Sequence, residues 1–372
     1  MEYYFWTEKM SVGYHLRPLI ENIEIGLKKG EILTLIGPNG AGKSTVLKSI
    51  TKQISLLGGV VYLDKHSVER MSGTELSQKM AVVLTERLRT EMMTCEDVVA
   101  TGRYPYTGRF GILSEADRRA VHEAMELVHV TEIKDEDFTR ISDGQRQRVM
   151  LARAICQEPE IVILDEPTSY LDIKYKLEFL SVLQRMQKLK GLTVIMSLHE
   201  LDLAARVSDK ILCVKGKYVE RFGTPEEIFR QGYLMELFDI SMGSFDEENG
   251  GIELEAIRGD AKVYVIAGGG TGRNVYRGLQ RQGTAFVTGI IFQNDLDYPV
   301  ARALAMNVIA TEAFEPIPNA LIVTAKKKID ECERVICCRS RFGTLETANK
   351  ELLAYARQRG KAIEMIDPEG FE

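Results

Sequence analysis

A glycine-rich stretch near the N-terminus constrains the fold more than any other part of the chain. An apolar run, residues 32–36, precedes it, and residues 44–50 follow with apolar side chains at helical spacing. The stretch fills every fixed position of the motif G-x-x-x-x-G-K-[ST] with Gly37, Pro38, Asn39, Gly40, Ala41, Gly42, Lys43, Ser44 and Thr45. A strand, a glycine turn and a helix start present backbone N–H groups to a polyphosphate. We therefore expect a nucleoside triphosphate here, with Lys43 on its β- and γ-phosphates and Ser44 on Mg²⁺; a purely structural glycine turn is the alternative.

The order of apolar runs predicts two α/β domains in the 372 residues. Up to about residue 240, short strands alternate with amphipathic helices, which is typical of a parallel sheet. We place strands at 32–36, 60–63, 80–84, 161–164, 193–197 and 210–215. The predicted division is a first domain over residues 1–244 with a mostly helical part at about 87–141, a linker at 245–260, and a small domain over 261–372.

The C-terminal domain is predicted as Rossmann-like, with strands at 262–267, 285–291, 320–324 and 334–338. Its turn, Gly268–Gly272, follows the first of these strands. Arg273 stands where the last glycine of G-x-G-x-x-G would fall, so tight packing of the turn is at least as well supported as ligand binding. Asp295 and Asp297 are interpreted as helix caps, with ligand binding as the alternative.

Composition excludes several classes of protein. The net charge of −6 argues against a general nucleic-acid binder. The chain has no apolar run near 18 residues and no signal-peptide core at its start, so we expect a cytosolic protein. Its six cysteines are expected to be thiols. Cys332, Cys337 and Cys338 could bind a metal, but buried strand positions are favoured.

Two acidic residues follow the apolar strand at residues 161–164. Asp165 and Glu166 would then lie at the carboxyl edge of the sheet, where ligands bind in open α/β folds. We expect Asp165 to hold Mg²⁺ through water. Glu166 would polarise the attacking water as a general base.

A helix start with a phosphate-binding character is predicted at Ser142, Asp143, Gly144 and Gln145. Ser142 can cap the helix that follows, and the free N–H groups of its first turn can bind phosphate. Taken alone, these residues could equally form a capped amphipathic helix.

Together these residues resemble the ATPase subunit of ABC transporters over about residues 1–240. Gly37–Thr45 looks like the Walker A loop, Ile161–Glu166 like Walker B and Ser142–Gln145 like the signature motif. The resemblance implies a switch role for His199, adenine stacking for Tyr14 and a D-loop role for Asp172, which could also cap a helix. Glu86 stands where the family usually has a glutamine that senses Mg²⁺ and the permease, so it is expected to accept Mg²⁺ or water.

The resemblance also implies partners. Two copies would form a homodimer with each ATP between the Walker A loop of one and the signature of the other, bound to permease subunits at the cytoplasmic face of the membrane. A substrate-binding protein would act indirectly. Residues 94–105 and 111–117 resemble importers of ferric siderophores, haem and cobalamin, with the Gly102-Arg103 element expected near the permease-facing surface. The alternatives are a non-transport ABC ATPase of translation or DNA repair, and a bifunctional chain with a C-terminal enzyme.

Overall fold

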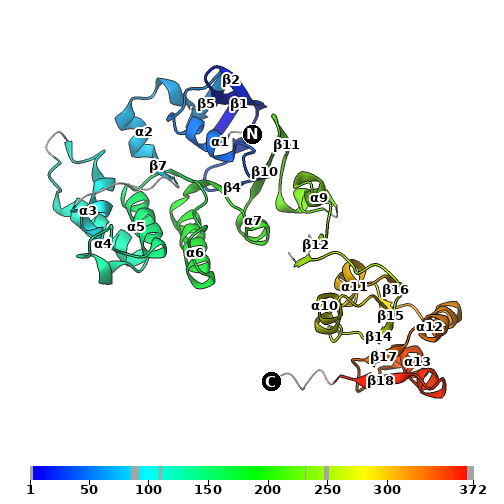
Figure 1. The fold of residues 1–372 in the computed structure, drawn as a ribbon. Coiled ribbons are helices and arrows are strands. Elements are labelled where there is room, and N and C mark those ends of the chain that lie inside the picture. The colour runs from blue at the N-terminus through cyan, green and yellow to red at the C-terminus, as the bar shows by residue number, and fades with distance from the viewer. Residues whose placement is uncertain (1–2, 85–91, 109–110, 231, 247–250, 367–372) are drawn as a thin grey trace. The chain divides into compact units, whose positions relative to one another are not determined.

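The computed structural model describes residues 3–84, 92–108, 111–230, 232–246 and 251–366. The chain divides into two compact units, Met1–Phe238 and Asp239–Glu372 (Figure 1). The segment expected as a linker lies in the second unit, where β12 (Ser244–Asp246) and β13 (Gly251–Glu253) pair as antiparallel strands. In the described part of the chain, no helix combines the length and the apolar character that crossing a membrane requires.

The first unit contains two sheets. A six-stranded sheet is parallel except for its edge strand β11; its strands are, in spatial order, β11 (Tyr218–Gly223), β10 (Lys210–Lys215), β4 (Ile32–Ile36), β9 (Thr193–Ser197), β8 (Ile161–Leu164) and β7 (Met80–Val83). The second sheet is antiparallel and consists of β2 (Arg17–Ile23), β1 (Phe5–Tyr14), β5 (Gly58–Leu63) and β6 (His66–Ser67), with β3 (Gly26–Leu27) on β1. The strand predicted at 60–63 exists, but it pairs with β1 in this antiparallel sheet.

A single apolar core joins the two sheets of the first unit. Phe5 and Met10 of β1 pack with Leu33 and Leu35 of β4 and with Leu47 of α1 (Lys43–Ile50). The central strand β4 is buried at every position, as its apolar sequence predicts. The phosphate-loop helix is therefore held between the sheets, and its N-terminus is fixed by the core.

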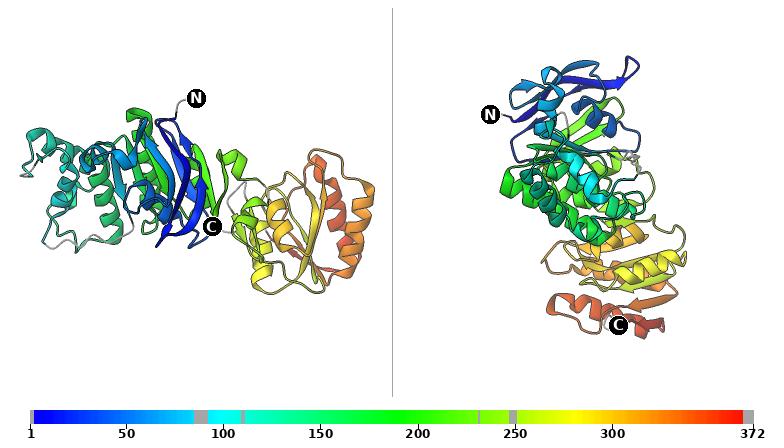
Figure 2. Two further views of the ribbon diagram at one scale, coloured as in Figure 1. Left: turned by 90° about the horizontal axis from the view of Figure 1, so that it is seen from above. Right: turned by 90° about the vertical axis from the view of Figure 1, so that its left-hand side faces the viewer.

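Further helices in the described part of the first unit lie beside one of its two sheets or form the mostly helical part seen in Figure 2. They are η1 (Val68–Arg70), α2 (Gly73–Lys79), α3 (Cys95–Ala100), η2 (Thr101–Arg103), α4 (Glu115–Leu127), η4 (Thr131–Ile133), α5 (Asp143–Cys156), α6 (Ile173–Lys190), α7 (Leu201–Val207), α8 (Pro225–Ile228) and α9 (Tyr233–Leu237). Helices α3 and α4 begin at Thr94 and Ser114, whose side chains each accept a hydrogen bond from the N–H three residues later.

The second unit is a three-layer α/β domain. Its parallel five-stranded sheet has the order β16 (Asn307–Thr311), β15 (Phe286–Phe292), β14 (Val263–Ile266), β17 (Arg334–Cys337), β18 (Ala362–Met365). One face packs against α10 (Arg273–Arg281) and α11 (Tyr298–Leu304). The other packs against α12 (Asn319–Glu331) and α13 (Thr347–Gln358), which follows η5 (Thr344–Glu346). In order along the chain, the strands lie 3-2-1-4-5 across the sheet.

One strand of the second unit was predicted wrongly. Residues 320–324 were expected to form a strand, but they are the first turns of helix α12. Ala325 and Ile329, four residues apart, are fully buried on one side of this helix, and that helical spacing outweighs the local Leu-Ile-Val run. The missing strand of the sheet is instead β16, which lies just before it in the sequence.

Candidate functional site

The phosphate loop has the strained backbone that its glycines predict. Gly37, Gly40 and Gly42 have φ angles of 148°, 78° and 100°, values that favour glycine. A Cβ added to Gly37 would lie 2.1 Å from the carbonyl oxygen of Val214. The turn therefore passes against β10 and enters α1 only because these positions carry no side chain.

Lys43 lies folded into this loop. Its Nζ donates hydrogen bonds to the carbonyl oxygens of Gly37 (2.8 Å) and Pro38 (3.1 Å). Burial lowers the pKa of its ammonium group, while the nearby Glu166 and Asp165 oppose that shift. Among the described residues, no carboxylate accepts a hydrogen bond from the backbone N–H groups of residues 39–44. The loop is thus a cationic, amide-lined turn suited to an anion.

Asp165 faces the start of α1 from the end of β8. Its Oδ1 accepts hydrogen bonds from Ser44 Oγ (3.1 Å) and Ser197 Oγ (2.8 Å), and the residue is 2% exposed. A carboxylate and a serine hydroxyl are oxygen ligands of the kind that Mg²⁺ prefers beside phosphates. The predicted pair of metal-binding residues is therefore brought together, and its donor atoms fit the ion.

Glu166 and His199 form an ion pair at the same sheet edge. The Nε2 of His199 lies 2.7 Å from Glu166 Oε1. Glu166 has a φ of 49°, a left-handed value that is uncommon for glutamate and can mark a functional constraint. The two predicted catalytic residues thus meet directly.

Ser197 is a site residue that sequence reasoning missed. Its hydroxyl donates to Asp165 and accepts from the backbone N–H of Glu166 at 2.9 Å, so it fixes both acidic residues. The residue is fully buried at the end of β9. Its signal was a lone hydroxyl at the end of an apolar strand that directly precedes Leu198 and His199.

The Ser142 helix start is confirmed, while adenine stacking by Tyr14 stays a prediction. Tyr14 ends β1, is 48% exposed, and accepts a hydrogen bond from Thr45 Oγ1 at 3.3 Å.

Ser142 caps α5: its Oγ accepts from Gln145 N, and Gln145 Oε1 accepts from Ser142 N. Gly144 lies against Leu171 and the carbonyl of Tyr170, and Asp143 pairs with Arg146. Asp172 caps α6 through Tyr175 N, which confirms that alternative.

Glu86, the residue expected to replace the usual glutamine, lies outside the described residues. The strand before it, β7, is present, and its Val83 carbonyl oxygen accepts a hydrogen bond from the N–H of Asp165 at 2.9 Å.

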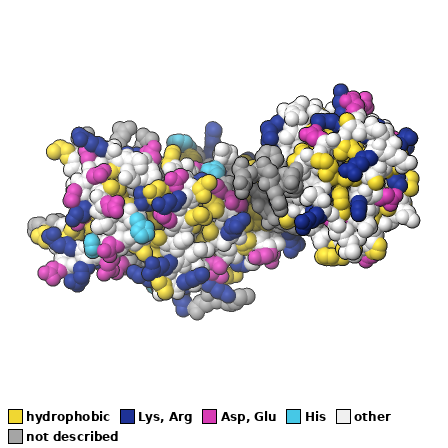
Figure 3. Space-filling view, turned by 90° about the horizontal axis from the view of Figure 1, so that it is seen from below, with side chains coloured by type: hydrophobic (Ala, Val, Ile, Leu, Met, Phe, Trp, Pro, Cys, Tyr) yellow, Lys and Arg dark blue, Asp and Glu magenta, His cyan; other side chains and the backbone are white. Residues whose placement is uncertain are grey.

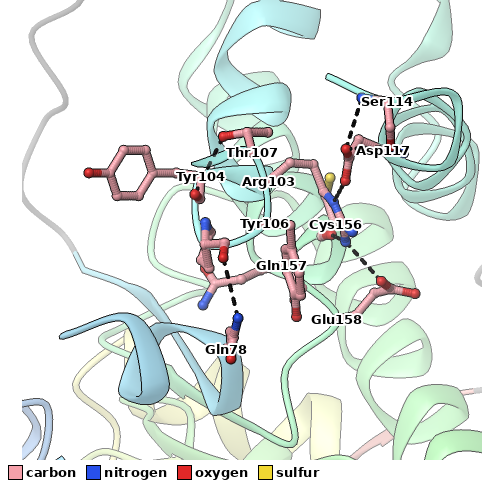
Figure 4. Close-up of polar contacts among 11 residues, drawn as sticks. Gln78, Arg103, Tyr104, Tyr106, Thr107, Ser114, Asp117, Cys156, Gln157 and Glu158 are labelled. Atoms are coloured by element: carbon pink, nitrogen blue, oxygen red, sulfur yellow. Dashed lines mark hydrogen bonds and ion pairs between the residues drawn. The ribbon is translucent and has the colours of Figure 1, made fainter. Parts of the chain in front are cut away.

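Arg103 anchors the Gly102-Arg103 element within the helical part, and its place near a permease-facing surface stays a prediction. Its guanidinium is buried rather than presented to a partner, and it donates to Asp117 of α4 (2.8 Å), to the Cys156 carbonyl (2.7 Å) and to Glu158 (2.8 Å) (Figure 4). The guanidinium also lies over the ring of Tyr106. A Cβ on Gly102 would meet the Arg153 carbonyl at 2.3 Å. The element therefore joins η2 to α4 and α5, while the neighbouring Tyr104 is 77% exposed.

The glycine turn of the second unit is occupied by carboxylates of its own chain. Gly269 N donates to both oxygens of Asp295 (3.0 and 2.8 Å). The N–H groups of Gly272 (2.9 Å) and Arg273 (3.2 Å) donate to Asp297, which is fully buried. The predicted capping role is thus correct in kind, but the helix that Asp297 caps is α10 rather than the following α11. Burial raises the pKa of Asp297, against the opposing effect of its hydrogen bond from Gly272 N.

The cysteines are free thiols, all of them buried. Burial raises the pKa of Cys156 and of Cys338 to about 12. Within the described ranges, no group of three or more His, Cys, Asp or Glu side chains is placed to hold a metal ion.

Comparisons with known proteins match two parts of the chain. Residues 20–169 match the family model described as ABC transporter. Residues 286–372 match the model of the MJ0874 family. The first range contains the phosphate loop, Ser142–Gln145, Asp165 and Glu166; the second lies within the C-terminal unit.

Three curated relatives are ATP-binding proteins of transport systems, as the first family model indicates. The chain is 42% identical over 285 residues to the uncharacterized ABC transporter ATP-binding protein MJ0873 of Methanocaldococcus jannaschii, covering 76% of this chain and 98% of that protein. It is 37% identical over 234 residues to the iron(3+)-hydroxamate import ATP-binding protein FhuC of Bacillus subtilis, covering 63% and 87%. It is 28% identical over 317 residues to the cobalamin import ATP-binding protein BtuD of Halobacterium salinarum, covering 83% and 79%.

Among solved structures, the ATP-binding cassette MJ0796, in a dimer bound to ADP and Pi, superposes with a TM-score of 0.53 at 25% identity. The match covers 59% of this chain and 98% of that one.

Proposed function

The chain belongs to the ATP-binding proteins of ABC transporters and is an ABC-type ATPase, and we propose that it powers an importer of a cobalamin, haem or iron-siderophore type of substrate through a partner permease. The observation that carries the ATPase assignment is the convergence of Lys43, Ser44 with Asp165, and Glu166 with His199 at one sheet edge. The permease, the substrate and the residue roles below are the proposal.

Each residue of this edge has a chemical task. Lys43 and the loop amides hold the β- and γ-phosphates. Ser44 and Asp165 hold Mg²⁺, which neutralises phosphate charge when bound. Glu166 orients and deprotonates the attacking water, and His199 fixes the Glu166 carboxylate and contacts the γ-phosphate. Tyr14, half exposed beside Thr45, stacks on adenine.

A second copy completes the site. Ser142 and Asp143 are exposed at the start of α5, where the positive end of the helix dipole favours an anion. We propose that this helix start contacts the γ-phosphate held by the partner copy. The likeness to a cassette dimer bound to ADP and Pi supports this arrangement. ATP then favours the closed dimer because only that state offers both sets of contacts.

The lengths of the segments matched by these relatives favour a cobalamin-type substrate among those proposed. The match to FhuC spans 234 residues, which is no longer than the first unit. The match to the halobacterial cobalamin protein spans 317 residues, more than the first unit contains, and so extends into the second. The second unit is thus partly shared with an ATPase named for cobalamin import.

The second unit is proposed to be a Rossmann-like regulatory or dimer-stabilising domain. Its strand order 3-2-1-4-5 corresponds to the first five strands of that fold.

The transport role is favoured over one in translation or DNA repair. On the face in Figure 3, Lys and Arg side chains are interspersed with Asp and Glu, and the net charge of −6 gives nucleic acid no general attraction. We expect the chain at the cytoplasmic face of the membrane, held there by its permease.

The ATPase mechanism is tested by Glu166→Gln. Loss of the general base should lower kcat by about 10²–10⁴-fold, while ATP binding persists and an ATP-dependent dimer accumulates. Turnover and size-exclusion chromatography with light scattering measure both. ATP turnover by this variant at the parent rate would show that Glu166 is not the general base.

The transport role is tested separately by affinity purification of the tagged full chain from detergent-solubilised membranes. A multi-span permease should co-purify in stoichiometric amount. Recovery of ribosomes or DNA instead, together with ATPase activity that they stimulate, would favour the alternative function.

A further inference from the structure

The carboxyl edge of the second unit's sheet holds a cavity that the ATPase function does not use. The cavity has a volume of about 290 Å³. Its walls come from the loops after β14, β15 and β16 and from η5, and they consist of Gly269, Phe292, Asn294, Asp295, Leu296, Phe314 and Leu345. Ligands of open α/β sheets bind outside the carboxyl ends of the strands. The cavity therefore lies where this fold places a small-molecule site.

The walls of the cavity are apolar and unusually exposed. Phe314 is 79% exposed, Leu296 is 59% exposed and Leu345 is 52% exposed. Large apolar side chains that gather around one hollow commonly mark a binding site, because each would otherwise be better buried. Two phenylalanines in the lining, Phe292 and Phe314, offer ring faces to a planar group.

The neighbouring glycine turn rejects a phosphate. The N–H groups that a pyrophosphate would need, those of Gly269, Gly272 and Arg273, all donate to Asp295 or Asp297. A phosphate would have to displace these carboxylates and would be repelled by their charge. Two of the arginines at this edge are also engaged: Arg339 donates to the Gly268 carbonyl and Glu346, and Arg273 donates to the Leu296 carbonyl.

Asp295 faces both the turn and the cavity. It follows β15, the strand beside β14, which is where dinucleotide-binding folds carry an acidic residue for ribose hydroxyls. Its carboxylate can accept further hydrogen bonds, since the two oxygens together offer about four acceptor sites. The edge thus pairs a carboxylate suited to sugar hydroxyls with aromatic walls, beside a glycine turn whose N–H groups already donate to carboxylates.

We propose that this cavity binds a nucleoside that carries no phosphate, with its base against Phe292 and Phe314 and its ribose hydroxyls on Asp295. Adenosine is the probe for this class, and AMP is the matched anionic probe. Equilibrium dialysis of labelled adenosine against the full chain tests the proposal. Saturating Mg²⁺ and a non-hydrolysable ATP analogue are included to block the site at Gly37–Thr45.

The expected result is saturable binding of one adenosine per chain, with AMP at least about tenfold weaker. Phe314→Ala should weaken adenosine binding by about fivefold or more, because one base stacked on an aromatic ring contributes roughly 1–3 kcal/mol. Asp295→Asn should also weaken it. Val323→Ala, an exposed apolar truncation on α12 that does not line the cavity, is the matched control and should leave binding unchanged.

Several results would overturn the proposal. They are the absence of saturable adenosine binding, equal affinity for adenosine and AMP, or parent-like affinity in both Phe314→Ala and Asp295→Asn. Phe314 is largely exposed, so its truncation tests binding even if Asp295→Asn perturbs the turn. The readout is independent of ATP hydrolysis and of permease binding, so its failure is distinguishable from failure of the transport role.

Discussion

In each unit of this chain, a glycine turn connects a strand of the parallel sheet to the helix that follows. The two turns bind side chains of opposite charge. In the first, Lys43 folds into the turn and donates to its carbonyl oxygens. In the second, Asp295 and Asp297 accept from its N–H groups. The first turn therefore holds a cation, and no carboxylate of the described residues accepts from its amides at residues 39–44, whereas amides of the second turn already donate to acids of its own unit.

The difference teaches that a glycine turn does not by itself make a phosphate site. Both turns use positive φ angles, at Gly40 and Gly42 in one and at Gly269 and Gly270 in the other. The two turns differ in the segment that contacts them from the end of another strand of the same sheet. β8 leads to Asp165, which accepts from a serine hydroxyl beside the loop. β15 leads to Asp295, which accepts from the turn at Gly269, and to Asp297, which caps α10.

The largest expected effect tests whether the two units are also separate in stability. Arg103→Met should lower the free energy of unfolding of the first unit by about 3–5 kcal/mol, because Asp117 would remain buried without its cation. The only tryptophan, Trp6, lies in β1, so its fluorescence follows this unit during urea denaturation. Arg118→Met, an exposed change on α4, is the control. An equal shift of both units would show that they unfold together.

The next prediction addresses the contents of the turns. Lys43→Ala should weaken ATP binding by about 10- to 100-fold, since a hydrogen bond to a charged group contributes roughly 1.5–3 kcal/mol. Calorimetric titration should then show no tight site in the whole chain. If one tight ATP per chain persisted, the second turn would bind triphosphate and the comparison would be broken.

A smaller effect is expected in the second turn. Asp297→Asn replaces a charged cap of α10 and should destabilise the second unit by about 1–2 kcal/mol. The change should appear in the circular-dichroism transition and leave the Trp6 fluorescence transition unmoved. Asp260→Asn, at an exposed position of the same unit, is the matched control. A parent-like transition would mean that the cap contributes little.

The smallest effect is a pH dependence. Burial raises the pKa of Asp297 above its unfolded value, so the folded state binds the proton more tightly. The stability of the parent relative to Asp297→Asn should therefore rise as pH falls through the folded pKa. This gain is complete below the unfolded pKa of about 3.9 and is lost again as pH rises. The opposite slope would show that the two amide bonds outweigh burial.

Sequence alone predicted the site residues that are close together in the chain or follow an apolar strand directly. The spacing from Gly37 to Ser44, the acids after residues 161–164 and the helix start at Ser142 all follow from local rules. The local pattern predicted the wrong element where an apolar run is compatible with both a strand and a helix. Residues 320–324 are apolar enough for a strand, but packing of Ala325 and Ile329 decided for a helix.

Sequence by itself thus determined that this protein has a polyphosphate loop, two acids for it and a second α/β unit. Tertiary structure decided which groups fill each turn and which serve the site. Only the fold could place Ser197 between Asp165 and Glu166, bury Arg103 against Asp117, and bring Asp295 and Asp297 onto Gly269 and Gly272. The physical reason is that these contacts join segments brought together by strand order, whereas sequence patterns report on neighbours along the chain.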